Sequence, residues 1–197
     1  MKKTFASILP LLLSIGGAIG FFAAFILTAE KYELLADPAF IPSCDLSPVV
    51  SCGSVMESWQ ASVFGFPNSL IGIAGFAVVM TIGMALLAGA SFKRWFWIGL
   101  ELGTIFGIVF VHWLFYNSVY VIGALCPYCM VVWTVTIPIF LYTTLYNFSV
   151  GHIKTPHALH GLIGFMQKYH MTVLYIWYIS IIIAITIRFW DYWSSLI

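Results

Sequence analysis

The sequence predicts an all-α integral membrane protein, and three observations lead to this prediction. Of its 197 residues, 62% are hydrophobic and 8% are charged, whereas soluble domains are about 45–50% apolar and about 25% charged. The mean hydropathy is +1.02. Several apolar runs reach the roughly 20 residues that a helix needs to cross a bilayer. We therefore expect one transmembrane domain over residues 1–197.

The apolar runs predict five membrane-spanning helices, at about residues 5–29, 69–90, 95–122, 127–148 and 171–190. The first run follows Lys2 and Lys3, as the apolar part of a signal peptide would. It is longer than the about 7–15 residues typical of such a peptide, and Thr28-Ala29-Glu30 is not a convincing cleavage site. We therefore interpret it as a retained helix.

The basic residues orient these helices. Only Lys31 and Arg188 fall on one side of the predicted bundle, and the other six fall opposite: Lys2, Lys3, Lys93, Arg94, Lys154 and Lys168. Because cytoplasmic loops carry the excess of Lys and Arg, the N-terminus is predicted to be cytoplasmic and the C-terminus extracytoplasmic. The predicted location is the cell (inner) membrane, with both cysteine segments on the extracytoplasmic side, where disulfides persist.

The net charge is +1, and the sequence has no cluster of basic residues, which argues against nucleic-acid binding.

The one long polar segment, residues 30–68, is predicted to be an extracytoplasmic loop. Within it, Ser54 and Glu57 have the spacing of a capping box, which predicts that a short helix begins at Ser54. Its apolar face would lie over the bundle as a lid. That face would consist of Val55, Met56, Trp59, Val63 and Phe64.

The four cysteines form two spaced pairs, Cys44 with Cys52 in the loop and Cys126 with Cys129 at a helix start. Three residues of helix rise by about 4.5 Å, so Cys126 and Cys129 lie on nearly one face. Pro127 suits the first helical turn, and the positive end of the helix dipole favours a thiolate at Cys126. Cys126 is therefore predicted to exchange with other thiols, and the deeper Cys129 to meet an acceptor in the lipid.

A quinone is the natural acceptor, because it takes two electrons and two protons and is confined to the bilayer. Cys44 and Cys52 would then carry electrons from a soluble protein to Cys126. One alternative is a zinc site of four thiolates, for which the Cys44 to Cys52 spacing is poor. Another is a structural or assembly membrane protein with two passive disulfides, although a CxxC disulfide constrains the unfolded chain little.

Other ionisable residues are given lesser roles. His152, His157, His160 and His170 lie in or beside a loop on the side opposite the thiols, so no metal site is expected there. Glu101 is expected to reach the cytoplasmic interface. His112 lies within a predicted helix, which favours neutral packing and leaves proton delivery to reduced quinone as an alternative.

Four segments in order resemble a bacterial homologue of vitamin K epoxide reductase: Cys44, Val50 to Val55, Pro67-Asn68-Ser69, and Cys126 to Cys129. The resemblance covers about residues 8–148. It implies a four-helix transmembrane bundle around a quinone, capped by the loop and its short surface helix, with a fifth helix added. Many bacterial members continue into a thioredoxin-like domain, and this sequence stops after the fifth helix. The expected donor is therefore a separate thioredoxin-fold protein of the DsbA type.

The resemblance also implies residue roles. Cys44 would exchange with the partner, Cys52 would pass electrons to Cys126, and Cys129 would attack the quinone or form a charge-transfer contact with it. Asn68 matches the asparagine that donates a hydrogen bond to a quinone carbonyl. Trp133 stands where the animal enzymes have a tyrosine, and it can donate only through its indole nitrogen. Reduction of ubiquinone or menaquinone is thus expected rather than epoxide reduction, with Trp59 and Phe64 as further candidates for the quinone pocket.

Overall fold

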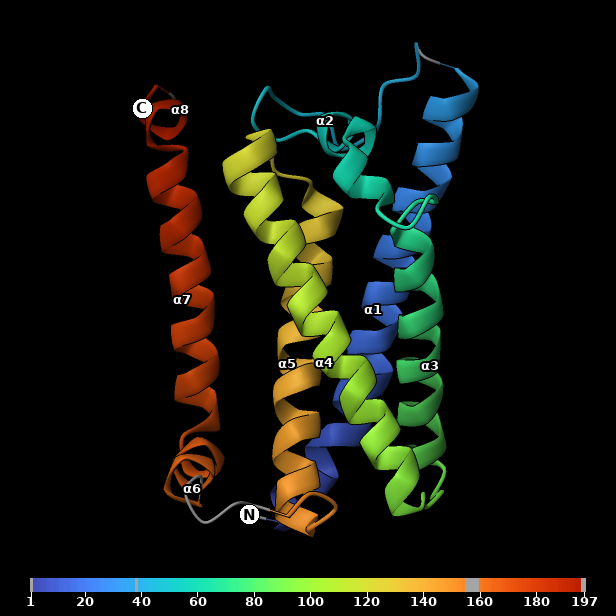
Figure 1. The fold of residues 1–197 in the computed structure, drawn as a ribbon, viewed down its shortest axis with the longest axis vertical. Helices are drawn as coiled ribbons and strands as arrows, with labels where there is room; N and C mark the ends of the chain where they lie inside the picture. The colour runs from blue at the N-terminus through green and yellow to red at the C-terminus, as the bar shows by residue number, and fades with distance from the viewer. Residues whose placement is uncertain (1, 38, 155–159, 196–197) are drawn as a thin grey trace.

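The computed structural model describes residues 2–37, 39–154 and 160–195 (Figure 1). His157 of the histidine group lies outside them, as do the side chains of Lys2 and Lys3. The long helices are α1 (Lys2–Ala36), α3 (Ser69–Leu87), α4 (Arg94–Tyr116), α5 (Pro127–Val150) and α7 (His170–Arg188). The shorter ones are α2 (Cys52–Glu57), η1 (Trp59–Ser62), η2 (Asn117–Ile122), α6 (His160–Lys168) and α8 (Trp190–Ser194).

Within the described residues, five segments are long and apolar enough to cross a membrane: Phe5–Ala36, Ser69–Leu87, Arg94–Ile122, Pro127–Val150 and His170–Arg188. They confirm the predicted number of spanning helices and the all-α class. These five segments make the chain a multi-pass membrane protein. The first helix continues to Ala36, beyond the predicted end at residue 29, so it includes the first residues of the predicted loop.

Helices α1, α3, α4 and α5 form a bundle, and α7 stands beside it (Figure 1). The loop and α2 lie across one end, which we call the cysteine end because it carries Cys44, Cys52 and Cys126. The opposite end, where α1 begins and α3 turns into α4, is called the far end. Since α1 begins at the far end and α8 lies at the cysteine end, an odd number of crossings separates them.

The close contact of α1 with α3 depends on small residues. A Cβ added to Gly17 would lie 2.7 Å from the backbone nitrogen of Met80. A Cβ added to Gly83 would meet the backbone of Leu13, 2.8 Å away. Apolar side chains gain no hydrophobic energy by leaving lipid for protein, so membrane helices associate through such close packing. These glycines fix α3 against α1, and α3 in turn forms one wall of the cavity described below.

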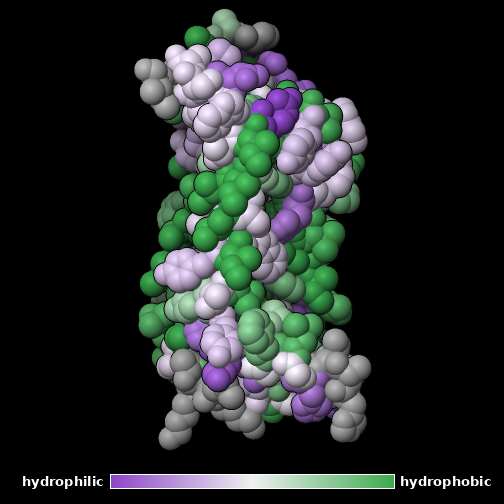
Figure 2. All heavy atoms as spheres, turned by 90° about the vertical axis from the view of Figure 1, so that its left-hand side faces the viewer, coloured by the Kyte–Doolittle hydropathy of each residue, from purple (hydrophilic) through white to green (hydrophobic). Residues whose placement is uncertain are grey.

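The surface around α7 is apolar. Figure 2 shows this side of the molecule, with hydrophobic residues over most of its middle and strongly hydrophilic ones mainly toward its ends. Large exposed side chains of α7 include Ile176, Ile183 and Ile187. A band of this kind suits contact with lipid, where soluble proteins would expose polar groups.

His112 joins α7 to the bundle. Its Nδ1 lies 2.8 Å from the carbonyl oxygen of Ile108, and its Nε2 accepts a 2.9 Å hydrogen bond from the indole nitrogen of Trp177 on α7. A carbonyl can only accept and an indole N–H can only donate, so Nδ1 must carry the ring proton. His112 is thus a neutral cross-link between α4 and α7.

Glu101 differs from its expected place at the interface. It is buried on α4 and accepts hydrogen bonds from the Thr144 hydroxyl at 2.7 Å and from the Asn147 amide at 2.8 Å, both on α5. These donors satisfy its carboxylate within the protein, so the side chain has no need to extend toward water. It helps to hold α4 against α5 near the far end.

The lid helix begins earlier than predicted. Ser51, not Ser54, is the N-cap of α2, and its hydroxyl accepts a 3.1 Å hydrogen bond from the Ser54 amide. The helix stops at Glu57 because Ser58 is extended, and η1 follows as a separate short 3₁₀ helix. The predicted single amphipathic helix is therefore wrong: two short pieces lie over the bundle at the cysteine end.

Candidate active site

The backbone brings the two cysteine pairs together. The amide of Leu125 donates to the carbonyl of Val49 at 2.7 Å, and the amide of Ser51 donates to the carbonyl of Leu125 at 3.0 Å. These two bonds form a short parallel bridge between the loop and the segment that precedes α5. Because Cys52 follows Ser51 and Cys126 follows Leu125, the bridge places the two cysteines side by side.

The sulfurs form a connected series. Cys44 and Cys52 are joined in a disulfide, while Cys126 and Cys129 are thiols. The Sγ of Cys126 lies 3.1 Å from the Sγ of Cys52, and both side chains are fully buried. Thiol–disulfide exchange requires an attacking sulfur next to a disulfide sulfur. The fold therefore holds Cys126 where it can exchange with Cys52.

Cys126 is the N-cap of α5, and Pro127 occupies the first helical turn as predicted. The hydrogen bond with the Cys129 side chain, together with the backbone amides of Cys129 and Tyr128, keeps the pKa of the Cys126 thiol below its ordinary value. Burial and the charge of Glu30 act in the opposite direction. Helix N-termini favour thiolates in this way, and a thiolate is the nucleophile in exchange.

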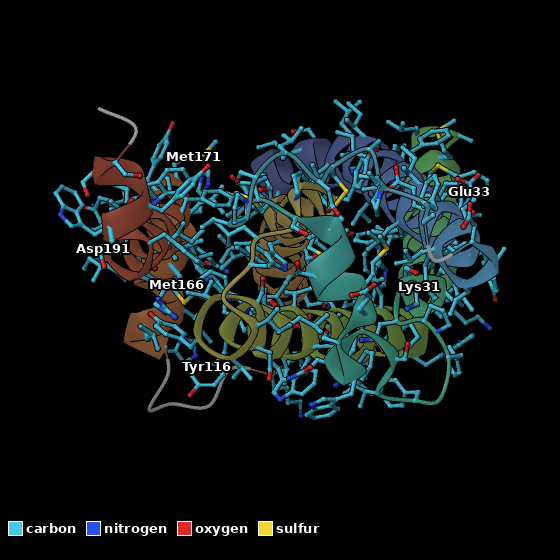
Figure 3. All side chains as sticks on the ribbon, turned by 90° about the horizontal axis from the view of Figure 1, so that it is seen from above. Lys31, Glu33, Tyr116, Met166, Met171 and Asp191 are labelled. Carbon is cyan, nitrogen blue, oxygen red and sulfur yellow. A yellow bond between two sulfur atoms is a disulfide. The ribbon has the colours of Figure 1, made fainter. Side chains whose placement is uncertain are left out.

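Cys129 lies on the wall of a large cavity. The cavity has a volume of about 650 Å³ and is lined by residues of α1, α2, η1, α3, α4, η2 and α5. This volume falls within the about 300–1,000 Å³ of typical ligand pockets. The wall is mostly apolar, with a few polar groups that include Lys31, Gln60, Asn68 and Asn117. Seen from the cysteine end, α2 covers the middle of the bundle, with the disulfide beside it (Figure 3).

Asn68 lies on this wall at the start of α3. Its side-chain oxygen accepts a 3.2 Å hydrogen bond from the Val63 amide, and its side-chain nitrogen donates a 2.6 Å bond to the Gln60 carbonyl. An amide nitrogen has two hydrogens, so one donor remains without a partner in the described part of the chain. A quinone carbonyl is an acceptor that fits this donor.

Trp133 also lies on the cavity wall and is held edge-to-face against Phe115, with ring centroids 5.1 Å apart. Trp59 and Phe64 are not among the residues that line the cavity: they are 68% and 49% exposed. Trp59 contacts Trp113, and Phe64 contacts Phe110, which does lie on the cavity wall. Their contact with a quinone therefore stays a prediction. The break after α2 turns η1 and its neighbours away from the position that a continuous helix would give them.

The sequence interpretation missed two buried polar residues of the site. Gln60 is 5% exposed and lies on the cavity wall, where its amide makes no hydrogen bond with the described residues. Glu30 is 8% exposed, and its Oε2 lies 3.6 Å from the Sγ of Cys44. The predicted boundary at residue 29 placed Glu30 in a solvated loop, whereas α1 in fact continues through it.

The described residues contain no group of three or more His, Cys, Asp or Glu side chains that could hold a metal ion. The four cysteines are not arranged as zinc ligands, since two of them already share a disulfide.

Comparison with known proteins identifies the family. Residues 11–144 match the model of the vitamin K epoxide reductase family, and this region contains all four cysteines, Asn68 and Trp133. No curated protein matches the chain. The matched region is more than half of the sequence and ends within α5, before α7 begins. The chain belongs to the vitamin K epoxide reductase family, whose members are quinone-associated thiol–disulfide oxidoreductases of membranes.

Proposed function

We propose that this protein is a thiol:quinone oxidoreductase that re-oxidises a thioredoxin-fold, disulfide-forming protein of the DsbA type. Electrons enter at Cys44 and Cys52, pass to Cys126 and Cys129, and leave to a membrane quinone, either ubiquinone or menaquinone. The activity supports disulfide formation outside the cytoplasm. One observation carries the proposal: the 3.1 Å contact between the sulfurs of Cys52 and Cys126, with Cys129 on the cavity wall.

The proposed transfer between the pairs follows from this contact. With Cys126 and Cys129 joined in a disulfide, the Cys52 thiolate attacks the Cys126 sulfur and releases Cys129 as a thiol. Cys44 then attacks Cys52, which forms the Cys44–Cys52 disulfide and releases Cys126. The arrangement in the structure has the bonding of this product. The dithiol of the loop is oxidised and that of α5 is reduced, so two electrons move toward the cavity.

The residues on the cavity wall fit a quinone. The apolar wall suits an isoprenoid tail, and Asn68 offers a free N–H to a ring carbonyl. Trp133 offers a second donor and an aromatic face. When bound, a quinone accepts two electrons and two protons. We propose that Cys129 hands the electrons over, because its side chain is the one of the redox pair that lies on the wall.

We propose that the cysteine end faces the extracytoplasmic space, with the N-terminus in the cytoplasm. The basic residues Lys93, Arg94 and Lys154 lie at the far end, in or beside the turns that connect the spanning helices, which is the pattern of a cytoplasmic side. The donor would approach at the loop. Ile41 and Leu46, which flank Cys44 in the sequence, are exposed apolar side chains on which a partner can pack.

The test is a coupled assay with the purified full chain, a reduced thioredoxin-fold donor and a short-chain quinone, followed by quinone absorbance. We expect quinone reduction that is stoichiometric with donor oxidation and is lost in Cys126→Ala. A protein with two passive disulfides would leave both the donor and the quinone unchanged. That result, obtained with a donor known to be reduced, would exclude the proposed function.

A further inference from the structure

Glu30 is a buried carboxylate placed against a reacting sulfur. It lies near the end of α1, and its Oε1 accepts hydrogen bonds from the backbone amide of Ser43 at 3.3 Å and from the Ser43 hydroxyl. Its Oε2 lies 3.6 Å from the Sγ of Cys44, and no other described residue donates a hydrogen bond to it. In the disulfide this sulfur carries no proton. As a thiol, Cys44 would donate its S–H to Oε2.

Burying a carboxylate is unfavourable unless it is well paired. No salt bridge compensates Glu30 in the described part of the chain: Lys31, the next residue, donates instead to the carbonyl oxygen of Met56 at 2.8 Å. A role for the charge in the chemistry of the adjacent cysteine would explain its retention at this position.

We propose that Glu30 is the general base that removes the proton from the Cys44 thiol when Cys44 resolves the Cys52–Cys126 mixed disulfide. The inference rests on the proposed function, because it takes the order of cysteine steps from it. The Cys44 S–H bond breaks and its proton goes to Glu30 Oε2. The Cys44 sulfur bonds to Cys52, the Cys52–Cys126 bond breaks, and Cys126 leaves as a thiolate with the electron pair. Thiols, disulfides, protons and charge all balance within the protein.

The charge on Glu30 also links the proton to the leaving group. The pKa of Cys126 is lowered chiefly by the Cys129 side chain, and the negative charge of Glu30 opposes this lowering. When Glu30 accepts the Cys44 proton, that charge disappears at the moment when the Cys126 thiolate forms. Proton transfer therefore generates the nucleophile and removes the repulsion on the leaving group in one event.

A route to water is present. The hydroxyl of Ser43 donates to Glu30 Oε1 and lies 3.2 Å from the hydroxyl of Tyr128. Ser43 is exposed, so this hydrogen-bonded pair connects the carboxyl group of Glu30 to solvent. Of the other titratable groups nearby, Cys126 is affected by the charge of Glu30, Lys31 donates to Met56, and Asp45 accepts a 2.8 Å hydrogen bond from the amide of Gly53.

The experiment uses the full chain carrying Cys129→Ala, which isolates the step from both donor and quinone. In this chain the disulfide can be Cys44–Cys52 with Cys126 free, or Cys52–Cys126 with Cys44 free. After a pH jump, acid quenching, alkylation and mass spectrometry give the rate at which one form becomes the other. Glu30→Gln keeps the shape and the acceptor for Ser43 but cannot take a proton.

General base catalysis contributes typically 10²–10⁴-fold, so we expect Glu30→Gln to slow the interconversion about 100-fold at neutral pH. The difference should shrink as the pH rises, because hydroxide can then remove the thiol proton in place of a base in the protein. Glu30→Asp should retain part of the rate and its pH profile, which keeps the test informative if the glutamine variant folds poorly. Glu33→Gln, which changes an exposed carboxylate one turn further along α1, should match the parent.

An unchanged rate in Glu30→Gln, or a slowing of equal size at every pH, would overturn the proposal, since the second result marks a structural displacement. Failure of the proposed function would appear differently, as absent quinone reduction in the unmodified chain. The two outcomes are therefore read in separate assays.

Discussion

The sulfur of Cys126 lies 3.1 Å from that of Cys52, although the two residues are 74 positions apart in the sequence. The contact depends on the backbone bridge between Ser51 and Leu125 rather than on the side chains alone. The fold thus holds these two sulfurs in position for the proposed exchange, and the order Cys44, Cys52, Cys126, Cys129 runs from the loop to the cavity wall.

The first prediction concerns the pairing of Cys52 with Cys126. The double variant Cys44→Ala/Cys129→Ala retains only these two cysteines, so mild oxidation should close a disulfide between them. The bond would link the loop to the start of α5 and change mobility on a non-reducing gel. Cys44→Ala/Cys126→Ala, which retains Cys52 and Cys129, is the control and should stay reduced under the same treatment. Equal cross-linking in both variants would contradict the exchange geometry.

The second prediction concerns the acidity of Cys126. Because the Cys129 side chain is the largest cause of its lowered pKa, Cys129→Ala should shift the titration of Cys126 to higher pH. The sign follows from stabilisation of the thiolate: without that hydrogen bond, a lower proton concentration is needed to ionise the thiol. Ultraviolet thiolate absorbance, measured against Cys126→Ala and with Cys44–Cys52 kept oxidised, gives the midpoint. A midpoint that does not move would assign the shift to the helix amides instead.

The spanning helices could be predicted from the sequence because apolar length alone decides whether a helix can cross a bilayer. The helix start in the loop could not, because Ser51 and Ser54 are both acceptable caps. The bridge to Leu125 pairs the backbone of Ser51 and holds it extended, which makes it the cap. The position of Glu101 also could not be predicted, because its partners Thr144 and Asn147 lie on another helix.

The residues predicted to contact a quinone also differ in how far the sequence could place them. Asn68 and Trp133 came from the resemblance to a family, and the structure brings both to the cavity with Cys129. Trp59 and Phe64 came from a helical pattern that assumed one continuous helix through residue 64, and the extended Ser58 breaks it. Gln60 was not predicted as a site residue, because a single glutamine in an apolar stretch forms no recognisable sequence motif. Only its burial beside the cavity marks it.

The third prediction separates Trp133 from Trp59. Trp133→Phe keeps an aromatic ring on the cavity wall but removes the indole N–H. A net hydrogen bond is worth about 0.5–1.5 kcal/mol, so the KM for quinone should rise roughly 2–10-fold. Trp59→Phe should leave this KM unchanged, because Trp59 lies outside the cavity. Steady-state quinone reduction measures both. An effect confined to Trp59 would place the quinone elsewhere.

The fourth prediction concerns Asn68. Asn68→Ala removes the free N–H together with the bonds to Gln60 and Val63, so we expect the KM for quinone to rise roughly 10-fold. The KM for the protein donor should not change, because the proposed donor site is the Cys44 side of the disulfide. A parallel rise in both constants would show that the variant disturbs the whole loop and not the quinone contact.

The fifth prediction concerns His112, which has two possible roles: a proton relay and a cross-link to α7. Both ring nitrogens are occupied, by Ile108 and Trp177, and His112 does not line the large cavity. A relay must exchange its ring protons, whereas these bonds fix one tautomer. His112→Phe should therefore weaken the attachment of α7 while the kcat for quinone reduction stays unchanged.

A double-mutant cycle can measure how much the hydrogen bond between His112 and Trp177 stabilises the protein. Hydrogen bonds between membrane helices average about 0.6 kcal/mol in such cycles, so His112→Phe and Trp177→Phe should couple by about that amount in the free energy of unfolding measured in detergent. A coupling near zero would mean that the two side chains are neighbours without a stabilising bond. A fall in kcat in His112→Phe, with no such fall in Trp177→Phe, would instead restore the relay. Trp177→Phe removes the donor to Nε2 and leaves the imidazole in place, so only a role of the ring itself in proton transfer could separate the two variants.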